Sequence, residues 1–92
     1  MNEYEEAKQK RYEEVKSKID MKMQEGYLPN IKAMEKEVRI LKRRVKSLHE
    51  GAILFAKDLD EAEKANQVLG RLDGEIAAYQ VFIDIYYSYL NK

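Results

Sequence analysis

The sequence predicts an all-α protein, an antiparallel helical bundle or hairpin of two to three long helices with coiled-coil-like packing, which we expect to be oligomeric. Three observations lead to this prediction. Helix-forming Glu, Lys, Gln and Ala dominate residues 2–25. Apolar residues recur every three or four positions from Ile31 to Leu90, as in the seam of a coiled coil. Gly and Pro punctuate the chain strongly at one place, the GYLPN of residues 26–30.

The first predicted helix covers about residues 2–25 and is amphipathic with a narrow apolar stripe. Its apolar positions are sparse but helically spaced: Tyr4, Tyr12, Val15, Ile19 and Met23. Gly26 can adopt the left-handed conformation that ends a helix, and Pro29 cannot lie inside one. Asn30 is a good N-cap for the helix that follows. We therefore expect a turn over residues 26–30.

The rest of the chain allows two architectures, because one apolar seam runs through nearly all of it. One continuous helix of about 60 residues would be on the order of 90 Å long. Alternatively, the chain turns near the AKDLDE of residues 56–61, where Asp58 and Glu61 would form an N-terminal capping box. We favour the turn, which predicts helices over about residues 31–57 and 59–91. The whole chain, residues 1–92, would then form a single helical domain.

The last predicted helix carries an unusually wide apolar face. Its apolar arc spans on the order of 240°, against roughly 100° for a helix buried on one side. A track of small residues, including Gly70 and Gly74, indicates that another backbone approaches closely. Either the first helix covers this second face, or a partner does. We predict an oligomer or partner interface formed by Tyr79, Phe82, Ile83, Ile85, Tyr86, Tyr89 and Leu90.

Charge is distributed unevenly along the chain, although its 17 basic and 17 acidic residues balance. Residues 31–49 hold seven basic and two acidic residues, whereas residues 50–75 hold three basic and seven acidic ones. Such blocks can fix the pairing of two antiparallel helices, or the basic block can bind an acidic partner or nucleic acid. Solvated charge beside a seam is the simpler alternative. The predicted contact residues are Lys32, Lys36, Arg39, Arg43, Arg44 and Lys46.

No pattern for chemistry emerges from the sequence. Cysteine is absent, and the single histidine, His49, has no partner at a metal-ligand spacing. The acidic stretch that begins at Asp58 lacks the ligand and glycine positions of a calcium loop. We therefore predict that the protein is not an enzyme and uses no cofactor or metal. A cytoplasmic location without membrane contact is expected, because the sequence has no secretory signal and no long apolar run.

These observations predict a non-enzymatic small helical interaction protein. We expect it to self-associate, with a homodimer favoured, and to bind, modulate or inhibit another macromolecule, with a protein as the expected partner. Its short, charged, cysteine-free character suits a regulator or an inhibitor, and we expect a phage or mobile-element origin from this general character, not from a motif. The first alternative is a nucleic-acid-binding regulator that uses the basic helix of residues 32–46. The second is a structural assembly protein.

Overall fold

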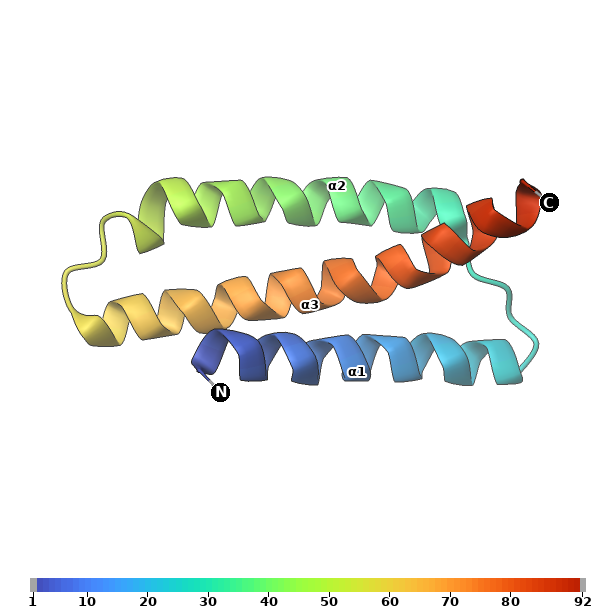
Figure 1. The fold of residues 1–92 in the computed structure, drawn as a ribbon, viewed down its shortest axis with the longest axis horizontal. Helices are drawn as coiled ribbons and strands as arrows, with labels where there is room; N and C mark the ends of the chain where they lie inside the picture. The colour runs from blue at the N-terminus through green and yellow to red at the C-terminus, as the bar shows by residue number, and fades with distance from the viewer. Residues whose placement is uncertain (1, 92) are drawn as a thin grey trace.

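The computed structural model describes residues 2–91 and is a bundle of three α-helices (Figure 1). Helix α1 covers Glu3–Gln24, α2 covers Ile31–Leu48 and α3 covers Leu59–Leu90, and a π-helical turn, η1, follows α2 over His49–Ile53. No strand is present among the described residues. The predicted all-α bundle is therefore confirmed, in its three-helix form.

Helix α3 is the central element of the bundle. It runs antiparallel to α2 and in the same direction as α1 (Figure 1). Cα atoms of α3 lie within 8 Å of both other helices, whereas no Cα atoms of α1 and α2, over their described ranges, come that close to each other. The two outer helices thus depend on α3 for their packing.

Local signals explain where each helix begins and where α1 ends. The side chains of Asn2, Asn30 and Asp58 each accept a hydrogen bond from the backbone N–H three residues later, which caps α1, α2 and α3. Gly26 has a positive φ of 99°. The N–H groups of Gly26 and Tyr27 donate to carbonyl oxygens of the last turn of α1, which is the Schellman arrangement.

The connection between α2 and α3 corrects one predicted boundary. We predicted a helix to residue 57, but α-helical geometry ends at Leu48, and η1 gives way to a non-helical stretch from Leu54 to Asp58. The chain turns at Asp58, and the carboxylate of Glu61 accepts a hydrogen bond from the Lys57 N–H at 2.9 Å. The continuous helix of 60 residues is thereby excluded.

The core is small and follows the predicted seam only in part. Its buried hydrophobic residues are Val15, Val38, Leu41, Ala65, Leu69, Ala78, Phe82 and Ile83. Gly70 and Gly74 are also buried, and a Cβ atom added at either would clash with a backbone carbonyl oxygen of α1, that of Tyr4 or Lys8. Helix α1 therefore covers the small-residue track of α3 by close backbone approach, which explains why it needs few apolar side chains.

Candidate functional site

The predicted interface residues of α3 separate into a buried and an exposed group. Phe82 and Ile83 are buried in the core of the chain itself, so their side chains are not available on its surface. Tyr79 is half-buried, and desolvation raises its pKa above the ordinary value of 10.0. Four residues of the predicted set remain accessible: Ile85, Tyr86, Tyr89 and Leu90.

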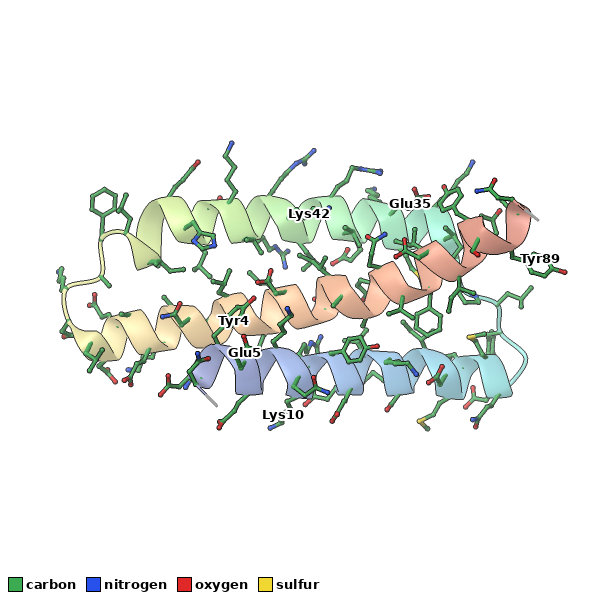
Figure 2. All side chains as sticks on the ribbon, viewed as in Figure 1. Tyr4, Glu5, Lys10, Glu35, Lys42 and Tyr89 are labelled. Atoms are coloured by element: carbon green, nitrogen blue, oxygen red, sulfur yellow. The ribbon has the colours of Figure 1, made fainter. Side chains whose placement is uncertain are left out.

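The accessible residues lie at the end of α3, where the α1–α2 turn also lies (Figure 1). Ile85 is 61% exposed and Tyr89 is 75% exposed, and Tyr89 points away from the bundle (Figure 2). The turn adds Tyr27 and Leu28, and Leu28 is 89% exposed. Large apolar side chains rarely gather on the surface of a monomer unless they form a binding site. We call this surface the apolar end: Tyr27, Leu28, Ile85, Tyr86, Tyr89 and Leu90.

Sequence reasoning did not include Tyr27, Leu28 or Tyr87 in the site. Tyr87 packs edge-to-face against Tyr86 with ring centroids 5.3 Å apart. Its hydroxyl donates to the Glu35 carboxylate at 3.1 Å, and this bond raises the pKa of Tyr87. The bond ties the end of α3 to the first turns of α2. An apolar pair in a turn, Tyr27-Leu28 beside Pro29, was the signal that could have identified the loop residues.

A second exposed apolar group lies at the opposite end of the bundle, in the α2–α3 turn (Figure 1). It consists of Leu54, Phe55 and Leu59, of which Phe55 and Leu59 are 73% and 74% exposed. We call this group the turn tip. Phe55 and Leu59 belong to the predicted seam, yet the helix break moves them out of the core. Both ends of the bundle therefore expose apolar side chains.

The predicted basic residues all lie on α2 with exposed side chains: Lys32, Lys36, Arg39, Arg43, Arg44 and Lys46. Side chains along the outer edge of α2 point away from α3 (Figure 2). In residues 2–91 no ion pair joins α2 to α3, so the charge blocks do not pair these helices as one interpretation of the sequence held. The basic residues remain accessible to an external partner.

A further polar surface is an open groove that α1, η1 and α3 line. His49 is exposed and lines an open groove with Tyr4, Asn66 and Asp73. Within residues 2–91 there is no group of acidic and histidine side chains suited to hold a metal ion. The described helices also include none with the length and apolarity needed to cross a membrane.

The fold and these surfaces define the chain as a three-helix bundle with exposed apolar ends and one basic face. Comparison of the chain with protein-family models, with curated proteins and with solved structures found no match.

Proposed function

We propose that the protein is a non-enzymatic helical interaction protein that self-associates through its apolar end and binds another macromolecule. The observation that carries the proposal is the exposure of the apolar end. Ile85, Tyr89 and Leu90 each leave more than half of their surface in water. Burying such side chains stabilises a complex by about 1.5–3 kcal/mol each before the costs of association are subtracted.

The surface area of the chain supports a second copy as the occupant of the apolar end. A monomer of 10.9 kDa is expected to expose roughly 5,600 Å², whereas this chain exposes 6872 Å². The elongated shape gives the chain this extra surface, roughly 1,300 Å², which exceeds the 800 Å² or so that each partner contributes to a standard interface. Tyrosine suits such a surface, because its ring can be buried while its hydroxyl stays hydrated at the rim.

A specific observation favours a second candidate, a structural assembly protein. The turn tip and the apolar end lie at opposite ends of an elongated molecule with extents of 49 × 21 × 20 Å. Two unlike apolar surfaces at opposite ends permit head-to-tail contacts, which propagate into open assemblies. Contacts of the apolar end with itself would instead close as a two-fold dimer.

The experiment compares the mass of three chains by analytical ultracentrifugation over a range of concentrations. We expect the unmodified chain to be a dimer. The double variant Tyr86→Ala with Tyr89→Ala should be mainly monomeric, because its affinity for a second copy should be at least tenfold lower. The matched control is Phe55→Ala with Leu59→Ala, which removes two exposed apolar side chains from the turn tip and should leave the dimer intact.

Other outcomes of this experiment are equally informative. A mass that rises without limit with concentration, and that both variants reduce, would favour the assembly protein. If Tyr86→Ala with Tyr89→Ala leaves the mass of the associated species unchanged, the assignment of the apolar end is wrong. Circular dichroism of each variant checks that the helices are retained.

A further inference from the structure

The outer face of α2 carries a straight row of exposed cations. Its members follow one another at steps of four, three, four and three residues, which keeps them within an arc of about 80° on a helix. The buried residues of α2, Val38 and Leu41, lie on the opposite side of the helix. We call this set the basic row: Lys32, Lys36, Arg39, Arg43 and Lys46.

The fold leaves the charge of the basic row largely unneutralised. Within residues 2–91 its one ion pair joins Lys46 to Glu50 at 4.0 Å, between two exposed side chains. Glu35 forms no ion pair with the row among the described residues, and its carboxylate accepts the hydrogen bond from Tyr87. In α1, by contrast, Lys16 pairs with Asp20 and Arg11 pairs with Glu14 and Glu75. The positive field is therefore concentrated on one face of one helix.

We propose that the basic row binds the phosphate backbone of a nucleic-acid duplex without reading its sequence. The row extends over fourteen residue steps, about 21 Å at 1.5 Å each. This length matches about six base pairs at 3.4 Å each along one strand. Long cationic side chains on a convex helix can follow a phosphate backbone, and contacts of this kind position a protein without specifying bases.

The composition of the row favours a duplex over two other polyanions. No large hydrophobic residue between Pro29 and Ile53 is strongly exposed, so the row lacks the buried apolar anchors of protein–protein interfaces. It also contains no aromatic side chain, whereas single-strand binding surfaces stack bases on aromatic rings. Charge alone, arranged in a line, is what a duplex backbone requires.

This inference rests on the proposed function in one respect, which is that the protein binds a macromolecule. It adds the chemical class of that macromolecule. Contacts to four phosphates predict that the logarithm of the binding constant falls with the logarithm of salt concentration with a slope of about −3.6. Between 50 and 200 mM salt the affinity should therefore fall by about two orders of magnitude. The salt dependence of binding tests the basic row, whereas the mass of the protein in solution tests the apolar end. Either proposal can therefore be contradicted without the other.

The test measures fluorescence anisotropy of a labelled DNA duplex of arbitrary sequence, about 20 base pairs long, at several salt concentrations. The row variant is Arg39→Gln with Arg43→Gln, and the matched control is Lys10→Gln with Lys18→Gln, which removes two exposed cations from α1. Both variants change the net charge equally. We expect the row variant to lower the magnitude of the slope by about 1.8, and the control to bind like the unmodified chain.

Three results would overturn the inference. The first is no binding to the duplex at 50 mM salt. The second is an equal loss of slope in both variants, which would mean that net charge, and not the row, attracts the duplex. The third is displacement of the duplex by polyglutamate at an equal concentration of charge, which would assign the row to an acidic protein surface. Repeating the titration on Tyr86→Ala with Tyr89→Ala shows whether a single chain suffices.

Discussion

A hydrogen bond between Tyr4 and Asp73 links the first turns of α1 to the middle of α3. The Tyr4 hydroxyl donates to the Asp73 carboxylate at 2.5 Å, and this bond, together with partial burial, raises the pKa of Tyr4 to about 12. Arg11, seven residues after Tyr4 on α1, donates to Glu75 at 2.7 Å. These two polar contacts flank the glycine track and hold α1 on α3 in one register.

Replacing Tyr4 with phenylalanine should destabilise the bundle in a pH-dependent way. The hydroxyl must be protonated to donate, and its pKa is about 12 in the folded chain against an ordinary value of 10.0. The bond therefore contributes fully below pH 10, and the contribution is lost as the pH rises from 10 to 12. At pH 7 we expect Tyr4→Phe to lower the free energy of unfolding by about 1 kcal/mol.

Urea denaturation at a series of pH values from 7 to 12 measures this effect. The curves of the unmodified chain and of Tyr4→Phe should converge at high pH. Tyr12→Phe on the same helix is the control, because the structure shows no hydrogen bond from the Tyr12 hydroxyl within the described residues. A difference between Tyr4→Phe and the unmodified chain that stays constant up to pH 12 would contradict the assignment.

Close approach between α1 and α3 is the main packing device of the bundle. Gly70 and Gly74 face α1 one helical turn apart, and the atoms nearest to an added Cβ are backbone atoms that cannot rotate away. A glycine within a helix costs roughly 1 kcal/mol relative to alanine. Glycine at these positions offsets that cost, because it lets the two helix backbones approach where side chains could not interlock.

Substituting alanine at Gly70 should therefore destabilise the protein, although alanine is the better helix former. We expect a loss of about 1–3 kcal/mol in the free energy of unfolding, because the methyl group forces α1 away from α3. The control is Gly51→Ala, where an added Cβ meets nothing within 4 Å and stability should stay level or rise. Chemical denaturation distinguishes the two, and a more stable Gly70→Ala variant would disprove the close approach.

The whole molecule is a short rod whose shape follows from the turn at Asp58. Its radius of gyration is 15.2 Å, with a longest extent of 49 Å, set by the length of α3. Apolar residues are exposed at its two ends and positive charge along one outer helix. The apolar surfaces face the two ends and the basic row faces sideways, so association at one end would leave the middle of the row, with Arg39 and Arg43, free.

Small-angle scattering tests this shape directly. We expect the Tyr86→Ala, Tyr89→Ala variant, chosen to isolate single chains, to give a radius of gyration close to 15.2 Å. A continuous helix from Ile31 onward would give a rod on the order of 90 Å long and a much larger radius. A maximum dimension near that length would rule out the turn and the packing built on it.

By itself, the sequence determined the helical class, the turn of residues 26–30 and the capped start at Asp58, because caps, glycines and apolar spacing act over a few residues. It also located the basic residues of α2, since a step of three and four places side chains on one helix face. It did not determine where α2 loses α-helical geometry, because the apolar spacing continues through His49–Ile53 and no Pro marks the end of the helix at Leu48.

Only the tertiary structure decided which parts of the apolar seam are core and which are surface. Phe82 and Ile83 became core because neighbouring helices cover them, whereas Tyr89 and Leu90, three turns or fewer from Phe82, remain in water. A periodic pattern predicts that one face of a helix is apolar. Whether the residues of that face are buried depends on where the neighbouring helices begin and end. The glycine track likewise acquired its meaning from the approach of α1, a segment more than 60 residues away in the chain.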